Sequence, residues 1–501
     1  MYKKIRKGII ENKFLILILL ITFIITSYPS FKYKLPVVQT DGASYYGYAK
    51  VYAETNNFDA LNPAWNMWGS LEQKVSDYPP LFTILLGNLL KITNKDIFLI
   101  NGFLLSFFFL LAIVYVYLIT LELTKNFENN KKIALLSAIF IALNVRAYFH
   151  IFSGQFTLFI SACLAFPAIY YTIKYCNEKM NIQLVASFIF VLLAGLTYMQ
   201  QVLYILILQF AYVLGHIAKR KVKIEFPKID IKFKFDKSDT KKIAIIIFPT
   251  VIIFTIIFLT YGINSNRSGF LSTIISSLFD NNVAGFQAIW AKFFITDGPI
   301  LFTMALIGLI YLIYTQEWNI LGIILGGSLI VISGSLFFVG EPMIKMLVYK
   351  FYFTFSVLMA ISASIIFVKL LSVKNLKNLF KFILILCLII EITKVGFFYS
   401  QIGEAITLEE YQASLSIKDQ NENMLFIFSD EADQGFKCFK WILVFSRSEK
   451  YDALKTLPEN LSKYKTLFII DKNKINLTRI EELSIFRKTF EGNNVIIYQI
   501  K

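Results

Sequence analysis

The sequence predicts an all-α polytopic membrane protein with a small C-terminal α/β domain. Of its 501 residues, 56% are hydrophobic and only 17% are charged, whereas a soluble domain carries about 25% charge. The apolar residues come in blocks of roughly 18 to 25, the length that crosses about 30 Å of hydrocarbon. Residues 400–501 are far less apolar and alternate short β-like runs with helical stretches. A water-soluble enzyme, a disordered chain and a disulfide-rich secreted module are therefore excluded.

The apolar blocks predict about eleven membrane spans. These lie near residues 14–31, 97–121, 132–149, 155–173, 182–199, 202–217, 243–262, 299–315, 319–339, 350–368 and 379–398. Basic residues precede the first block and no small-residue cleavage site follows it, which indicates an uncleaved first helix with a cytoplasmic N-terminus. The most basic tract of the chain, residues 218–242, then falls on the same side.

This topology divides the chain into a transmembrane part, residues 1–399, and an extracytoplasmic domain, residues 400–501. Two further long segments, 32–96 and 263–298, fall on the outer face. The net charge of +16 gathers in loops between spans, so the expected partner is the lipid bilayer of the cell membrane and not a nucleic acid. Within the last segment, the pattern predicts strands at 425–428, 466–470 and 495–500 and a helix at 477–486.

The first outer loop carries the most informative residues. Asp41 lies about ten residues beyond the first span, and a carboxylate there can accept a proton from a hydroxyl at the membrane surface, which is general-base work. Tyr45 and Tyr46 follow, with Trp65 and Trp68 further on. Flat amphipathic rings suit both sugar stacking and anchoring at the interface. The alternative interpretation is that Asp41 caps a short helix and the rings form an ordinary interfacial belt.

The loop then reaches Tyr78-Pro79-Pro80-Leu81, which opens an apolar segment, residues 81–92, that is too short to span. The two prolines fix an extended entry and pre-set the start of a helix. The leucines of the segment fall on one helical face, so we expect this helix to lie along the membrane interface.

These residues resemble a pattern of the GT-C superfamily of membrane glycosyltransferases. The nearer likeness is to a branch of multispanning proteins labelled as 6-pyruvoyl-tetrahydropterin-synthase-related. The pattern has an Asp soon after the first span, a Pro/Trp/Gly cluster, Tyr-Pro-Pro-Leu, and a Gly-containing entry to the fourth span with a later Pro. The matching residues are Asp41, the run 62–69 (NPAWNMWG), the run 78–81 (YPPL), and Gly154-Gln155-Phe156 with Pro167.

The resemblance implies an inverting transfer of a sugar from a polyprenyl-phosphate donor to an acceptor hydroxyl on the outer membrane face. In that reaction Asp41 deprotonates the acceptor and the lipid phosphate leaves. The chain departs from the family at Gly42, where many members have a second acid. The remaining acids of the loop are Glu54, Asp59 and Asp77. No DxD motif or His cluster marks a metal site, so dependence on a divalent cation stays open.

A leaving phosphate needs cations near the membrane surface. Arg146 and His150 lie at the outer end of the third span, on one helical face by their four-residue spacing. Lys345 and Lys350 follow the ninth span on the same side of the membrane, where span-edge charges are more often functional than surface charges. The alternatives are a snorkelling Arg beside an interfacial His and an ordinary loop ion pair. The candidate donor-binding residues are Arg146, His150, Gln155, Lys345, Lys350, Tyr45, Tyr46, Trp65, Trp68 and Tyr78.

Two other functions fit the same pattern. A transporter or flippase of lipid-linked saccharides predicts ionisable residues or broken helices near the midplane, while the polar residues here concentrate at the outer ends of spans. One such place is the outer turn 197–201, which offers side chains to sugar hydroxyls or is a plain polar turn. A non-catalytic membrane scaffold that displays residues 400–501 would tolerate loss of Asp41. The sugar, the prenyl carrier and the acceptor (protein, glycan or lipid) are not encoded in any spacing.

Overall fold

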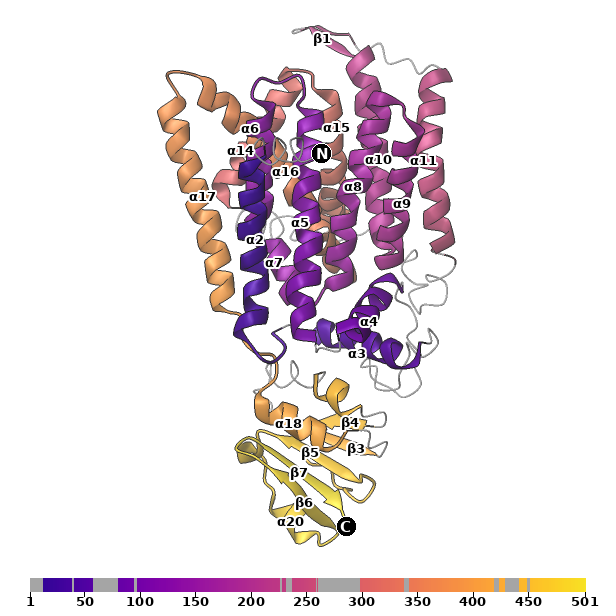
Figure 1. Cartoon of the computed structure of the whole chain (residues 1–501), viewed down its shortest axis with the longest axis vertical. Coiled ribbons are helices and arrows are strands. Elements are labelled where there is room, and N and C mark those ends of the chain that lie inside the picture. The colour runs from indigo at the N-terminus through magenta and orange to yellow at the C-terminus, as the bar shows by residue number, and fades with distance from the viewer. Residues whose placement is uncertain are drawn as a thin grey trace.

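The protein is a tall bundle of helices with a small separate domain at one end, as a computed structural model describes it (Figure 1). The structure describes residues 12–37, 40–56, 80–93, 97–225, 228–230, 237–257, 259, 298–337, 342–418, 423–428, 441–447 and 451–501. Within these ranges, eight helical stretches are long and apolar enough to cross a membrane. The predicted multi-pass membrane fold is confirmed.

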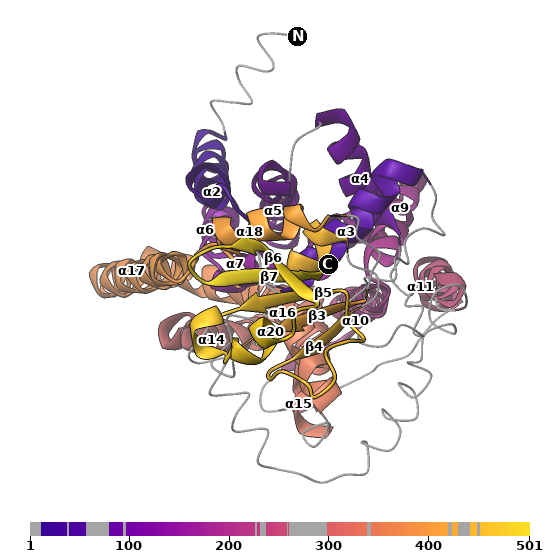
Figure 2. The same cartoon turned by 90° about the horizontal axis from the view of Figure 1, so that it is seen from below.

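The helices of the bundle follow the predicted spans closely. They are α2 (Lys13–Lys32), α5 (Ile97–Leu123), α6 (Asn130–Ala142), α7 (Val145–Phe152), α8 (Phe156–Glu178), α9 (Asn181–Thr197), α10 (Gln200–Lys221), α11 (Lys237–Ile257), α14 (Pro299–Tyr314), α15 (Trp318–Phe337), α16 (Pro342–Ser372) and α17 (Lys377–Ser400). Helices α8 and the described part of α16 bury most of their side chains and form the centre of the bundle, whereas α11 and α17 lie at its edge (Figure 2).

The third predicted span, 132–149, matches the candidate membrane stretch Asn130–Phe152, but this stretch is not one continuous helix. It is broken into α6 and α7 at Leu143 and Asn144, where the backbone of Asn144 becomes extended (φ −71°, ψ 107°). The Asn144 side chain caps the new helix by accepting hydrogen bonds from its first-turn amides. A capping residue that satisfies free helix-end amides makes such a break tolerable inside a membrane bundle. The break allows α7 to be oriented independently of α6.

Small residues allow the helices of the bundle to approach closely. A Cβ placed on Gly215 of α10 would lie 2.2 Å from the backbone oxygen of Trp318, and one on Gly322 of α15 would lie 2.5 Å from that of Ala211. Neither backbone atom can move away as a flexible side chain would. Such small-residue contacts are the usual device of helix packing in membranes, where no hydrophobic force draws helices together.

Two shorter helices lie across one end of the bundle (Figure 1). These are α3 (Thr40–Thr55) and α4 (Leu81–Thr93), which pack against each other. Their approach is close at Gly87, where a Cβ would lie 2.6 Å from the ring of Tyr52. The predicted helix at 81–92 is thus confirmed, and its Phe82 and Leu86 are buried. We call this end of the bundle the domain end, because the C-terminal domain also lies there.

The C-terminal domain holds a mixed sheet of five strands in the order β4-β3-β5-β7-β6. The strands are β3 (Met424–Ile427), β4 (Tyr451–Leu454), β5 (Thr466–Ile470), β6 (Phe486–Glu491) and β7 (Val495–Ile500), with helices α18 (Leu408–Ser416) and α20 (Thr478–Glu482). The three predicted strands are β3, β5 and β7, and the α/β class is confirmed. The predicted helix at 477–486 is too long, because α20 ends at Glu482 and β6 begins at Phe486.

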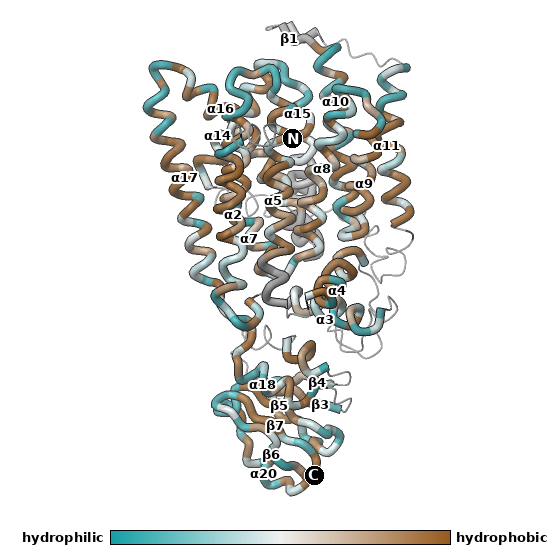
Figure 3. The backbone as a smooth tube through the Cα atoms, viewed as in Figure 1, coloured by the Kyte–Doolittle hydropathy of each residue, from teal (hydrophilic) through white to brown (hydrophobic). Residues whose placement is uncertain are grey.

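The opposite end of the bundle carries a short antiparallel hairpin of β1 (Lys223–Glu225) and β2 (Lys228–Asp230). We call it the hairpin end. The helices are apolar through their middle, and hydrophilic residues gather at the hairpin end (Figure 3). The hairpin belongs to the basic tract 218–242, so the structure separates this tract from the C-terminal domain by the full length of the bundle.

Candidate functional site

The junction between α7 and α8 at the domain end is held by side-chain hydrogen bonds. The Asn144 Oδ1 atom accepts from the backbone N–H of Arg146 at 2.9 Å, and its Nδ2 donates to Ser356 Oγ of α16 at 2.7 Å. Asn144 and Ser356 are both buried. Since one amide caps α7 and also bonds α16, the orientation of α7 is fixed relative to the centre of the bundle.

Arg146 and His150 both lie on α7, as predicted. The Arg146 guanidinium carbon lies 4.8 Å from the centroid of the Tyr352 ring, a cation–π contact between α7 and α16. The His150 Nδ1 atom lies 2.7 Å from Gln155 Oε1, and an amide oxygen can only accept, so Nδ1 carries the proton. In a neutral ring Nε2 is then an acceptor, and it is buried with no hydrogen-bond partner in the described ranges.

Tyr45 joins α3 to this junction. Its hydroxyl lies 2.8 Å from Thr157 Oγ1, two residues after Gln155 in the chain, and its ring packs edge-to-face with Phe82 and at a tilt against Phe156. Asp41 lies in the first turn of α3, one helical turn before Tyr45. The Asp41 side chain is outside the described part of the structure. The backbone that carries it is nevertheless tied to the α7–α8 junction.

The other predicted residues fall in three places. Lys345 and Lys350 lie in the first turns of α16, and their side chains are outside the described ranges; Lys350 precedes Phe351 and Tyr352 in the helix. Trp65, Trp68 and Tyr78 are all outside the described residues. Tyr46 lies on α3, and its ring packs against Trp441 of the C-terminal domain.

A second group of buried polar side chains lies on α10 and α16, and sequence reasoning missed most of it. Gln201 is fully buried, and neither of its amide atoms has a hydrogen-bond partner within the described residues; the same holds for the Tyr204 hydroxyl and the Thr354 hydroxyl. The Tyr204 ring stacks on Phe351 with the centroids 5.0 Å apart. An unsatisfied buried polar group costs about 1–3 kcal/mol, so a further polar partner at any of these three side chains would stabilise the protein.

The only signal of this group in the sequence is the polar turn 197–201, which ends at Gln201. Phe351 and Tyr352 are neighbours on α16, and they contact Tyr204 and Arg146 respectively. Two adjacent aromatic residues therefore connect the α7 site to the α10–α16 polar group. The spacing of residues along separate spans could not have predicted this meeting.

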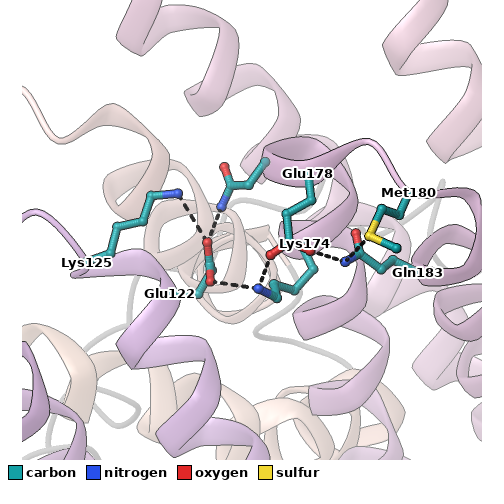
Figure 4. A network of polar contacts seen from close by, with 7 residues as sticks. Glu122, Lys125, Lys174, Glu178, Met180 and Gln183 are labelled. Atoms are coloured by element: carbon teal, nitrogen blue, oxygen red, sulfur yellow. Dashed lines mark hydrogen bonds and ion pairs between the residues drawn. The ribbon is translucent and has the colours of Figure 1, made fainter.

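The hairpin end is organised by ion pairs (Figure 4). Glu122 at the end of α5 lies 3.2 Å from Lys125 and 3.4 Å from Lys174 of α8, and it also accepts a hydrogen bond from Asn177 at 2.7 Å. Lys174 in turn pairs with Glu178, which accepts from Gln183 of α9. The network connects α5, α8 and α9.

Two further ion pairs connect neighbouring helices at the hairpin end. Lys219 pairs with Glu317, and Lys221 pairs with Asp239 at the start of α11. Charges that neutralise one another between helix ends are typical of structural fastening.

One ion pair lies inside a span. Glu391 and Lys394 of α17 are 2.6 Å apart, and the Glu391 side chain is almost fully buried. A Cβ on Gly298, which immediately precedes α14, would lie 3.0 Å from a Glu391 carboxylate oxygen. The carboxylate therefore faces the N-terminus of α14, where a negative charge is stabilised by the free amides and the helix dipole.

Metal ligands do not gather in the part of the chain that the structure describes. No group of three or more His, Cys, Asp and Glu side chains there is placed to hold an ion. Asp41 and the loop 57–79 are outside the side chains covered by this statement, so the role of a divalent cation stays a prediction.

Comparison with known proteins identifies the fold. No model of a protein family and no curated protein matches the sequence. Solved structures do match: the apo oligosaccharyltransferase of Archaeoglobus fulgidus has a TM-score of 0.60 at 12% identity, covering 98% of this chain and 74% of that chain. ArnT of Cupriavidus metallidurans, bound to undecaprenyl phosphate, has 0.57 at 9% identity over 97% and 98%. The arabinofuranosyltransferase AftD from Mycobacteria has 0.56 at 9% over 97% and 41%.

These matched proteins are GT-C glycosyltransferases. The chain therefore has the fold of the GT-C superfamily, and the resemblance drawn from Asp41 and the Tyr-Pro-Pro-Leu run is confirmed at that level. The nearer likeness to the 6-pyruvoyl-tetrahydropterin-synthase-related branch stays a prediction.

Proposed function

We propose that this protein is a membrane glycosyltransferase that moves a sugar from a polyprenyl-phosphate carrier to an acceptor hydroxyl. The reaction takes place at the domain end, on the outer membrane face. The GT-C fold supports the class of reaction. Structures of ArnT with undecaprenyl phosphate and of the archaeal oligosaccharyltransferase AglB with dolichol-phosphate support a lipid-phosphate donor here.

The observation that carries the proposal is the meeting of α3, α7 and α8 at the domain end. Arg146 and the His150–Gln155 pair lie at the α7–α8 junction, to which Tyr45 fastens the helix that carries Asp41 in its first turn. A base, a cation and polar groups for sugar hydroxyls are the parts that glycosyl transfer to a hydroxyl requires. Few other reactions need all three at a membrane surface.

In the proposed reaction the acceptor oxygen attacks the anomeric carbon and gives its proton to Asp41. The bond from that carbon to the phosphate oxygen breaks, and the lipid phosphate leaves with the electron pair. Attack opposite the leaving group inverts the anomeric centre. Arg146, with Lys345 and Lys350, stabilises the charge that develops on the phosphate. A positioned general base contributes roughly 10²- to 10⁴-fold to such a step.

The test uses purified protein in proteoliposomes with a panel of polyprenyl-phosphate sugars and a crude acceptor extract. Release of polyprenyl phosphate is measured for wild type and for Asp41→Asn. We expect turnover with at least one donor and a loss of roughly 10²-fold or more in the variant. Equal turnover would contradict the role of Asp41 and move the base to Glu54, Asp59 or Asp77. The absence of turnover with every donor would contradict the transferase.

A transporter of lipid-linked saccharides is the second candidate, and the Glu391–Lys394 pair is the observation that favours it. Ionisable residues within a span often mark a transport path. The pair also has a structural explanation, because Glu391 faces the N-terminus of α14. Translocation of a labelled lipid-linked sugar by wild type, abolished in Glu391→Gln but not in Asp41→Asn, would establish transport instead of transfer.

A further inference from the structure

The C-terminal domain contacts the chain just before Asp41. The backbone N–H of Ala405 donates to the Pro36 oxygen at 2.6 Å, and the Tyr33 hydroxyl donates to the Ile402 oxygen at 2.7 Å. Residues 402–405 connect α17 to α18, so they form the entry to the C-terminal domain. The segment between the first span and α3 is therefore paired with that entry by hydrogen bonds.

The same domain contacts α3 just after Asp41. The Tyr46 ring lies 5.9 Å from Trp441 and 6.4 Å from Phe445, both in the helical segment 441–446. Trp441 is fully buried and Tyr46 nearly so. One residue beyond that segment, Arg447 forms an ion pair with Glu54 near the end of α3. These contacts cover a helix face different from that of Tyr45.

Adjacent residues of α3 thus pack in two directions. Tyr45 contacts Thr157, Phe82 and Phe156 in the bundle and α4, while Tyr46 contacts the C-terminal domain. The helix needs such support. It has 16 residues, just above the about 12–15 below which an isolated helix is marginal even when rich in alanine, and it contains Gly42 and Gly47, each of which costs about 1 kcal/mol relative to alanine.

We propose that the C-terminal domain positions the helix that carries the catalytic base. Trp441 and Arg447 are positioning residues, which act on Asp41 through α3 and do not touch the reacting atoms. A displacement of about 1 Å in a reacting group can lower a rate by roughly 100-fold, so loosening α3 lowers kcat while donor binding is kept. This inference rests on the proposed role of Asp41 for its catalytic part.

The experiment is a charge exchange in the full-length protein in proteoliposomes. We expect Arg447→Glu to lower kcat by about tenfold with little change in the donor KM. The variant removes an ion pair between α3 and the C-terminal domain and no contact with the donor. Glu54→Arg alone has the same effect, and the double variant recovers to within about twofold. Lys463→Glu is the matched control: its ion pair with Asp452 lies within the C-terminal domain, and kcat stays unchanged.

Backbone hydrogen exchange of residues 40–55 gives a readout that does not depend on activity. We expect exchange to rise in Arg447→Glu and in Trp441→Leu. It returns to the wild-type level when Arg447→Glu is combined with Glu54→Arg, and it is unchanged in Lys463→Glu. Unchanged exchange in both Arg447→Glu and Trp441→Leu would overturn the proposal. Raised exchange in these variants with an unaltered kcat would also overturn it. Should the wild type show no transfer at all, the proposed function fails, and exchange alone then decides whether the domain holds α3. Recovery with arginine at position 54 would also exclude Glu54 as the base.

Discussion

The two ends of the bundle hold their polar residues in opposite ways. At the hairpin end, charged side chains neutralise one another, as in the Glu122 network and the Lys219–Glu317 pair. At the domain end, His150 and Gln201 are buried with atoms that have no partner among the described residues. One end is fastened mainly by ion pairs, whereas the other holds buried polar side chains with no partner among the described residues.

The two ends differ in their main type of polar interaction, although both contain buried polar atoms without a partner among the described residues. The hairpin end also has buried atoms without a partner in the described ranges, at Gln183, Trp318 and Asn319, with one such atom in each side chain. At the domain end, both amide atoms of Gln201 lack a partner within the described residues, as do the hydroxyls of Tyr204 on α10 and Thr354 on α16. Unsatisfied polar groups are costly, so these side chains lower the stability of the fold unless a further partner binds them.

Among the variants that compare the two ends, Arg146→Gln is expected to have the largest effect on transfer. Loss of the cation beside Tyr352 removes a charge from the proposed phosphate site, and we expect kcat/KM for the donor to fall by about 100-fold. Arg146→Lys is the matched variant, which keeps the charge but not the planar fork, and it should fall less. Steady-state release of polyprenyl phosphate measures both. Unchanged kinetics in Arg146→Gln would remove Arg146 from the site.

The next effect concerns Gln201→Met, which replaces an unsatisfied buried amide by an apolar side chain of similar length. We expect the thermal midpoint to rise, corresponding to about 1 kcal/mol, while transfer falls about tenfold because a polar partner of the sugar is lost. A differential scanning fluorimetry melt and the transfer assay are made on the same sample. A lower midpoint together with full activity would show that Gln201 is structural.

At the hairpin end, Glu122→Gln should have the reverse profile. It removes the negative charge that Lys125 and Lys174 share, so stability falls by about 0.5–1 kcal/mol in this partly exposed network. Transfer at saturating donor should stay within about twofold of wild type. A loss of activity as large as that of Arg146→Gln would contradict the division of roles between the two ends.

The smallest expected effect lies in the C-terminal domain. A hydrogen bond from Tyr464, assisted by Lys463, holds the pKa of Asp452 below its ordinary value. A lowered pKa stabilises the fold above the unfolded pKa of about 4, and this stabilisation is lost as pH falls through the folded pKa. Asp452→Asn should therefore lower the melting temperature slightly at pH 7, and the difference from wild type should shrink toward pH 3. A difference that is independent of pH would contradict this.

Much of the fold could be predicted from the sequence because hydrocarbon imposes a length and a polarity on each span. The strands β3, β5 and β7 could also be predicted, because they are central in the sheet and their sequences are nearly continuous apolar runs. The strands β4 and β6 were missed because they lie at the two edges of the sheet and are mostly exposed. An edge strand buries too little to leave an apolar signal.

The site could be predicted only in part. The proximity of Arg146 and His150 could be predicted from the sequence, because both residues lie on one short helix. The different packing partners of Tyr45 and Tyr46 could not be predicted, because α3 packs on neighbours that are distant from it in sequence. The break at Asn144 was hidden within an apolar run of suitable length for one span. Tyr204 and Phe351 meet across α10 and α16, and such contacts depend on the packing of helices and not on local spacing.

The most direct test of the account compares Asp41→Asn with Glu122→Gln in a single-turnover transfer of labelled sugar. Each variant replaces one carboxylate by its amide, at opposite ends of the bundle. The account predicts a loss of roughly 10²-fold or more for Asp41→Asn, with unaltered thermal stability, and transfer within about twofold of wild type for Glu122→Gln. Equal rates for the two variants, or full transfer by Asp41→Asn, would contradict the claim that the domain end carries the chemistry.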